Sequence, residues 1–110
     1  LIGNMASNRL RGRQGDDILY GGSGGNDVLI GGRGRDQFWI DTQPGSFAKV
    51  KDFGVKKDQL VFSVPRSSLS FSSVGDDLLI RHDDTPVARL RGVSSISWMR
   101  DALFSGFDGL

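Results

Sequence analysis

The chain has 110 residues, with 14 Lys and Arg against 13 acidic residues and 37% hydrophobic residues, which fits one small globular domain with a modest core. It contains no Cys, which excludes disulfides, zinc-thiolate sites and thiol nucleophiles. No apolar run approaches the roughly 20 residues of a membrane-spanning helix. The first residues, Leu1, Ile2 and Gly3, include neither an initiator Met nor a basic signal region, so we expect a fragment of a longer protein.

The acidic residues and the glycines are distributed unevenly. All 13 acidic residues are Asp, and 10 of the 16 Gly lie in residues 1–39. Asp offers a short carboxylate and tolerates turn geometry, whereas Gly adopts positive φ. Together they indicate tight turns that hold a hard cation.

Four rows of nine residues fill the first third of the chain. The rows begin at Gly3, Gly12, Gly22 and Gly31, with Gly21 as an extra residue. Position six holds Asn8, Asp17, Asp27 and Asp36, and position eight holds Leu10, Leu19, Leu29 and Phe38. Six Gly-rich residues predict a turn and the next three a short strand with its middle side chain inward. We therefore expect rows one and three in one parallel sheet and rows two and four in another, with the position-eight residues facing each other across a thin core.

Rows two and four resemble the RTX, or haemolysin-type calcium-binding, repeat. The residues that carry the resemblance are Gly12, Gly15, Asp17 and Leu19 in one row and Gly31, Gly32, Gly34, Asp36 and Phe38 in the other. Row four matches every position, and row two departs only at Arg13. The resemblance implies Ca²⁺ between these two turns, held by the carboxylates of Asp17 and Asp36 and by the carbonyls of Arg13, Gly15, Gly31 and Arg33.

The same resemblance implies a weaker site on the opposite edge. Its ligands would be Asn8 and Asp27, with the carbonyls of Asn4, Ala6, Gly22 and Gly24, so that a neutral amide replaces one carboxylate. Family members often close a last site with an Asp four residues before an Asp-Phe pair. Here that position is Ala48, and Asp41 is the nearest substitute.

The rest of the chain predicts strands. Alternating apolar residues indicate strands at 59–64, around Leu69 and Phe71, at 77–82 and at 86–90. The stretches VKDFGVKKDQLVF and GDDLLIRHDDTPVARLRGV resemble the segment that ends RTX arrays and the cap that follows it. The predicted architecture is all-β, with a parallel β-roll of nonapeptide repeats over residues 1–39 and a β-strand cap over residues 40–110. A possible short C-terminal helix would carry Ile96, Met99 and Leu103 on one face.

The cap is expected to cover the outer face of the roll. Outward positions seven and nine hold Ile18, Tyr20, Val28, Ile30 and Trp39, which is too apolar for a face open to water. Strand residues near Phe62, Phe71 or Leu79 are expected to pack there, making the roll and the cap one cooperative unit.

The sequence predicts a module without catalytic function. The single His82 lies in a predicted strand beside a turn, and neither G-x-S-x-G nor H-E-x-x-H is present. By resemblance we expect a calcium-binding module of a larger bacterial protein that is exported by the type I secretion machinery and folds outside the cell. The same reading implies a monomer that binds no nucleic acid.

The sequence is also compatible with two other functions. In the first, the module is the non-catalytic tail of a secreted protease, lipase or polysaccharide-modifying enzyme. In the second, it is an adhesive or polyanion-binding module. The second alternative rests on Arg9, Arg11, Arg13, Arg33 and Arg35.

Overall fold

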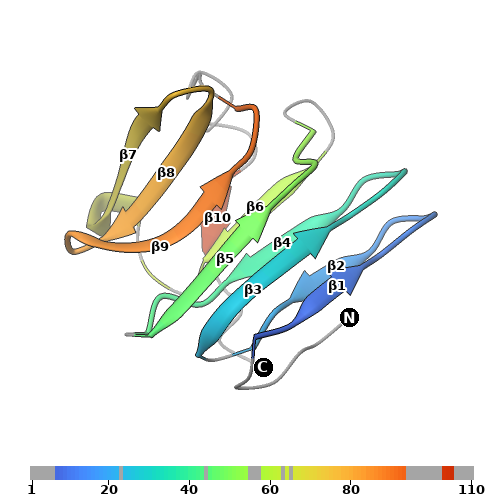
Figure 1. Ribbon diagram of the computed structural model, residues 1–110, viewed down its shortest axis with the longest axis horizontal. Helices are drawn as coiled ribbons and strands as arrows, with labels where there is room; N and C mark the ends of the chain where they lie inside the picture. Colours follow the sequence, from blue (N-terminus) through green and yellow to red (C-terminus); the bar gives the residue numbers. More distant parts are fainter. Residues whose placement is uncertain are drawn as a thin grey trace.

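The structure is a computed structural model that describes residues 7–22, 24–43, 45–54, 58–62, 64, 66–93 and 103–105. These residues form ten strands and one 3₁₀ turn, shown in chain order in Figure 1. The elements are β1 Arg9–Arg11, β2 Ile18–Tyr20, β3 Gly25–Ile30, β4 Gln37–Ile40, β5 Ser46–Val50, β6 Gln59–Phe62, η1 Arg66–Ser68, β7 Leu69–Val74, β8 Asp77–His82, β9 Thr85–Leu90 and β10 Leu103–Ser105.

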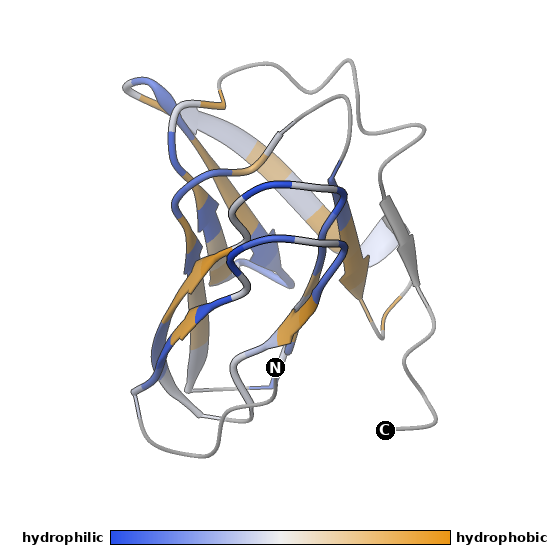
Figure 2. Ribbon diagram, turned by 90° about the vertical axis from the view of Figure 1, so that its right-hand side faces the viewer, coloured by the Kyte–Doolittle hydropathy of each residue, from blue (hydrophilic) through white to orange (hydrophobic). Residues whose placement is uncertain are grey.

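The strands of the nine-residue repeat pair in parallel in two separate sheets, as predicted. One sheet has the order β1-β3-β5-β9-β8-β7 and the other β10-β6-β4-β2. Leu10 pairs with Leu29 in the first sheet, and Leu19 pairs with Phe38 in the second. In Figure 2 the two sheets stand apart as two layers joined by the turns.

The core lies between these two layers. Leu19, Leu29 and Phe38 are fully buried, and the half-buried Leu10 packs against them. The ring of Phe38 lies 5.9 Å from that of Phe53. Because inward residues of both sheets meet here, the position-eight residues form one continuous hydrophobic core with the following strands.

The strands after residue 40 extend the sheets at their edges. β5 pairs in parallel with β3, and β6 pairs in parallel with β4. β9 then joins β5 in parallel, and β8 and β7 follow as antiparallel strands. The predicted strands at 59–64, around Leu69, at 77–82 and at 86–90 are therefore confirmed within one or two residues.

The prediction that these strands cover the outer face of the roll is wrong. Phe62 pairs with Ile40 within the same sheet and is buried in the core, so its strand is a neighbour of β4 and does not lie on top of it. Ile18 remains 46% exposed, and Tyr20 and Trp39, which pair directly, are half-buried. The unpaired N–H and C=O groups at a sheet edge bind an added strand through backbone hydrogen bonds, and this interaction is stronger than packing on a face with scattered apolar side chains.

Two further local differences separate the structure from the sequence predictions. β5 was not predicted, because its row lacks the Gly and Asp positions of the repeat. Leu103 lies in β10, which pairs in parallel with β6, so the predicted C-terminal helix is wrong at that residue. Ile96 and Met99 lie outside the described residues. Among those that are described, no helix is long and apolar enough to cross a membrane.

Candidate metal site

The turns of rows two and four stack directly on each other. The Gly12 amide donates to the Ile30 carbonyl over 2.8 Å, and the Arg33 amide donates to the Arg13 carbonyl over 2.9 Å. At the end of the turn, the Gln37 amide donates to the Asp17 carbonyl over 2.8 Å. These bonds place residues 12–17 against residues 31–36 along their whole length.

Asp17 and Asp36 meet at this turn-to-turn contact. The Asp17 amide donates to Oδ1 of Asp36 over 2.9 Å. Oδ2 of Asp17 and Oδ2 of Asp36 are both buried, and neither accepts a hydrogen bond from any described residue. Asp36 itself is only 1% exposed. A buried carboxylate oxygen without a donor is costly, and a cation relieves that cost.

The glycines of these turns leave room for oxygen atoms. A Cβ at Gly12 would lie 2.6 Å from Oδ2 of Asp17 and 2.8 Å from the Gly31 carbonyl oxygen. A Cβ at Gly32 or Gly34 would collide with the carbonyl oxygen of Arg13 or Gly15, respectively. The carbonyls of Arg13, Gly15 and Gly31 thus lie at the same contact as the two carboxylates, and Arg33 lies in the same turn.

The electrostatics at Asp36 favour a cation. Burial is the main cause that raises the pKa of Asp36, and the nearby charges of Asp58, Asp17 and Asp52 raise it further, against the hydrogen bond from the Asp17 amide. No group of three carboxylate or imidazole side chains among the described residues is arranged to hold a metal. The donors present are two carboxylates and main-chain carbonyls, which are the oxygen ligands that hard cations prefer.

Asp52 and Asp58 close this edge of the roll. Asp52 accepts hydrogen bonds from the amides of Gly31 and Gly32 over 2.9 and 2.7 Å. Asp58, which is 2% exposed, accepts from the Asp36 amide over 2.9 Å and from the Gly54 amide over 2.7 Å. Asp58 therefore has the same position relative to Asp36 as Asp36 has relative to Asp17, since Asp58 accepts a hydrogen bond from the Asp36 amide as Asp36 does from the Asp17 amide. The Asp-Phe pair of the sequence resemblance is Asp52 and Phe53, but the sequence did not predict the hydrogen bonds of Asp52 and Asp58.

The opposite edge joins Asn8 and Asp27. The Asn8 amide donates to Oδ1 of Asp27 over 2.8 Å, and Nδ2 of Asn8 donates to the Gly21 carbonyl over 3.2 Å and to Oδ1 of Asp27 over 3.3 Å. The side chain of Asn8 thus supplies donors where Asp17 supplies only acceptors. Burial raises the pKa of Asp27, which is 3% exposed.

Gly21 takes the role of the first glycine in row three. A Cβ at Gly21 would collide with the Asp27 carboxylate, as one at Gly12 or Gly31 would with its own Asp. The extra residue is thus accommodated inside the turn, between Gly21 and Asp27. Gly22 and Gly24 lie in this turn with positive φ, while Asn4 and Ala6 lie outside the described residues.

A small cavity lies next to Asp27 at the following turn. Ala48 pairs with Asp27 in register and offers no carboxylate. Asp41 reaches the cavity instead, with Oδ2 accepting from the Tyr20 hydroxyl over 3.1 Å and Oδ1 from the Gln43 amide over 2.9 Å. The cavity is lined by Gly21, Gly22, Asp27, Trp39, Asp41, Ser46, Phe47 and Ala48.

His82 lies where the sequence placed it, at the end of β8 beside the turn at 83–84. Its Nε2 is 3.5 Å from Oδ2 of Asp83, whose side chain is largely exposed. His82 is remote in sequence from every residue of the candidate metal site.

Residues 2–38 match the family model of the RTX calcium-binding nonapeptide repeat, in four copies. No curated protein matches the chain.

Arg13 is a non-glycine residue in a turn position that has a left-handed backbone conformation. It has φ of 71°, where row four has Gly32 with φ of 82°. The left-handed conformation costs an L-residue about 1–2 kcal/mol. We predict that Arg13→Gly raises the free energy of unfolding in EDTA by about 1 kcal/mol, or the thermal midpoint by roughly 4–8 °C. Arg13→Ala, which removes the charge but keeps Cβ, is the control. Equal midpoints for the two variants would contradict the role of backbone strain.

The buried carboxyls predict a pH dependence of the metal-free chain. Asp27 and Asp36 have pKa values raised above 3.8 mainly by burial, so they bind protons more tightly when folded than when unfolded. Their contribution to the free energy of unfolding is therefore present at low pH and is lost as pH rises through the raised pKa values.

The measurement is the thermal midpoint in EDTA from about pH 4 upward. The thermal midpoint of the parent chain should fall as pH rises, and this fall should be lost in the double variant Asp27→Asn/Asp36→Asn. The lowered pKa of Asp77 gives the opposite slope, but it does so equally in both proteins and cancels in their difference. The same slope in both proteins would show that these two carboxyls do not control it.

Proposed function

Because residues 2–38 are four copies of the RTX calcium-binding repeat, we propose that the chain is a calcium-binding β-roll module whose folding is completed by Ca²⁺. The observation that carries the proposal is the pair of buried, unpartnered oxygens, Oδ2 of Asp17 and Oδ2 of Asp36. Each Oδ2 atom lies beside a glycine of its own turn, Gly12 for Asp17 and Gly31 for Asp36, and a cation bound there would supply the partner that neither acceptor has.

The main site takes Ca²⁺ with Asp17 and Asp36 as the anionic ligands. The carbonyls of Arg13, Gly15, Gly31 and Arg33 complete a set of oxygen donors, and a set of this size and flexibility suits Ca²⁺ better than the smaller Mg²⁺. When bound, the ion supplies the positive charge that balances the carboxylates of Asp17 and Asp36, whose Oδ2 atoms are buried. The glycines keep Cβ atoms out of the space between these oxygens.

The opposite edge forms a weaker site with Asn8, Asp27 and the carbonyls of Gly22 and Gly24. The Asn8 side chain already donates to Gly21 and Asp27, so this edge is partly satisfied without metal. Asp27 and Asp41 line the cavity at the next turn, where two carboxylates favour a cation in place of the family's position at Ala48.

The module acts in export and folding. We place it in a larger bacterial protein that leaves the cell by type I secretion and folds outside, where Ca²⁺ drives the unfolded chain into the roll. Residues 1–39 form the repeat region and residues 40–110 its cap, in one cooperative, monomeric unit. The RTX repeat is a calcium-binding, non-catalytic module, so any catalysis by the parent protein belongs to other parts of that protein.

Calcium should stabilise the chain through Asp17 and Asp36. Extracellular sites bind at about 10⁻⁴ to 10⁻³ M, and ligand about tenfold above Kd adds about 1.4 kcal/mol. We predict a rise of about 5 °C or more in the thermal midpoint at about 10 mM Ca²⁺, and a far smaller rise in Mg²⁺. Asp17→Asn and Asp36→Asn should each remove most of the calcium response.

Asp76→Asn is the matched control, because Asp76 is an exposed turn residue between β7 and β8. It makes the same charge change far from the roll in sequence. If Asp76→Asn lost as much of the calcium response as Asp17→Asn, the ion would be acting through overall charge, and the assigned site would be wrong.

Asn8→Asp should convert the weak edge into a second strong site. The substitution replaces the amide donor with a carboxylate oxygen, which restores the pair of acceptors seen at Asp17 and Asp36. We predict that calorimetric titration gains about one Ca²⁺ per chain in the millimolar range. In EDTA this variant should be less stable than the parent, because it adds a carboxylate beside Asp27. An unchanged stoichiometry together with unchanged stability in EDTA would refute this account of the second edge.

A further inference from the structure

The outer face of the six-stranded sheet carries two rows of basic residues. In the first row, Arg9 pairs with Val28, Val28 with Lys49, and Lys49 with Arg89. Burial alternates along β1 and β5, with Leu10, Ala48 and Val50 more buried than their neighbours, so these cationic side chains are on the face away from the core.

A second row lies two residues further along each strand. Arg11 pairs with Ile30. The Lys51 amide donates to the Leu29 carbonyl, and the Arg91 amide donates to the Val50 carbonyl, which continues the parallel register past the strand ends. We call the six cations of the two rows the basic stripe: Arg9, Arg11, Lys49, Lys51, Arg89 and Arg91.

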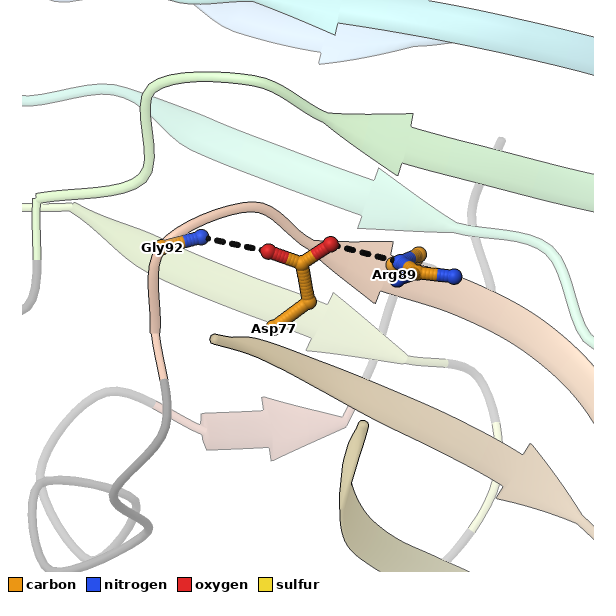
Figure 3. Close-up of polar contacts among 3 residues, drawn as sticks. All are labelled: Asp77, Arg89 and Gly92. Atoms are coloured by element: carbon orange, nitrogen blue, oxygen red, sulfur yellow. Dashed lines mark hydrogen bonds and ion pairs between the residues drawn. The ribbon is translucent and has the colours of Figure 1, made fainter. Parts of the chain in front are cut away.

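Within the described part of the chain, Asp77 is the acidic residue that interacts with the stripe, at Arg89 and Lys49. Asp77 is 2.7 Å from Nε of Arg89 and accepts a 2.9 Å hydrogen bond from the Gly92 amide (Figure 3). It therefore balances one of the six cations. Asp52 follows Lys51 in the chain but accepts from the Gly31 and Gly32 amides. Arg9, Arg11 and Arg91 are exposed, and Lys49, Lys51 and Arg89 are half-buried.

The stripe is long and narrow. Neighbouring strands lie about 4.8 Å apart, so each row spans roughly 14 Å across β1, β3, β5 and β9, and the two rows are separated by about 7 Å. Charges in two parallel rows match a single extended chain that bears anionic groups on both sides. The turn residues Arg13, Arg33 and Arg35 lie outside these rows.

The composition of the rows distinguishes between classes of polyanion. Single-stranded nucleic acid is held largely by aromatic side chains on which its bases stack. The two rows contain only Arg, Lys, Val28 and Ile30, and Phe47 lies two residues before Lys49, outside both rows. We propose that the basic stripe binds a linear anionic polysaccharide through its carboxylate or sulfate groups. This proposal does not depend on the calcium site, because no member of the stripe is among the proposed ligands.

The test uses the 110-residue chain at one saturating Ca²⁺ concentration, with heparin as the probe and NaCl varied. Arg9→Gln/Arg11→Gln removes two exposed cations of the stripe. Arg35→Gln removes one exposed cation of a turn outside the stripe, and its effect is compared with the stripe variant per charge removed. We expect the stripe variant to weaken binding about tenfold and to reduce the salt slope of log K by about two, roughly one for each cation removed. The control should change affinity less than about twofold.

Three outcomes would overturn the proposal. They are no binding of heparin by the parent chain, an equal loss per charge removed in both variants, and tighter binding of oligothymidylate than of heparin at equal charge concentration. The last result would assign the stripe to nucleic acid. The calcium-induced shift in thermal midpoint, measured on each variant, checks that both are folded and reports on the calcium site separately.

Discussion

The roll depends on a carboxylate placed beneath a backbone amide of the turn two rows earlier. Asp36 accepts from the Asp17 amide, Asp27 from the Asn8 amide and Asp58 from the Asp36 amide. Each bond uses one carboxylate oxygen and buries the other. An unsatisfied buried polar group costs about 1–3 kcal/mol, and more when it is charged. The stacking that forms the two sheets therefore creates a demand for positive charge or hydrogen-bond donors at the turns, and how that demand is met decides whether the roll is stable.

The chain meets this demand in three chemically different ways on one backbone geometry. Asp58 receives a second backbone donor from Gly54, so that each of its carboxylate oxygens has a partner. Asn8 brings its own amide donors to Gly21 and Asp27. Asp17 and Asp36 have neither, and their Oδ2 atoms lack donors among the described residues. Under the proposed function, the demand for Ca²⁺ is therefore strongest at the contact between rows two and four. The edge at Asn8 and Asp27 already has protein donors, so we propose that it binds the ion more weakly.

Much of this fold followed from the spacing of residues in the repeat. Asp17 and Asp36 are 19 residues apart, as are Asn8 and Asp27, so two rows and one extra residue predict both sheets and their pairing. β5 was not predicted because the spacing of 19 residues is not kept: Asp27 pairs with Ala48. Without an Asp at that position, the row has no periodic signal in the sequence. The hydrogen bonds of Asp52 and Asp58 were also not predicted, since they depend on the path of the chain through residues 52–58. The strands near Phe62, Phe71 and Leu79 extend the sheets and do not cover Tyr20 and Trp39, because apolar patterning does not distinguish a face from an edge.

The difference between face and edge also explains why Arg9 and Arg11 are grouped in one surface with four later cations, Lys49, Lys51, Arg89 and Arg91, a grouping that the sequence did not predict. A stacked array ends with unpaired amides and carbonyls, and β6, β9 and β8 satisfy them by joining the sheets laterally. Lateral joining keeps the register, so Lys49 and Arg89 fall in line with Arg9 although they lie far along the chain. In the sequence, the same cations are separated by turns, acidic residues and core positions. The parallel register that ends the roll therefore creates the basic stripe, and the surface is a consequence of how the edge is closed.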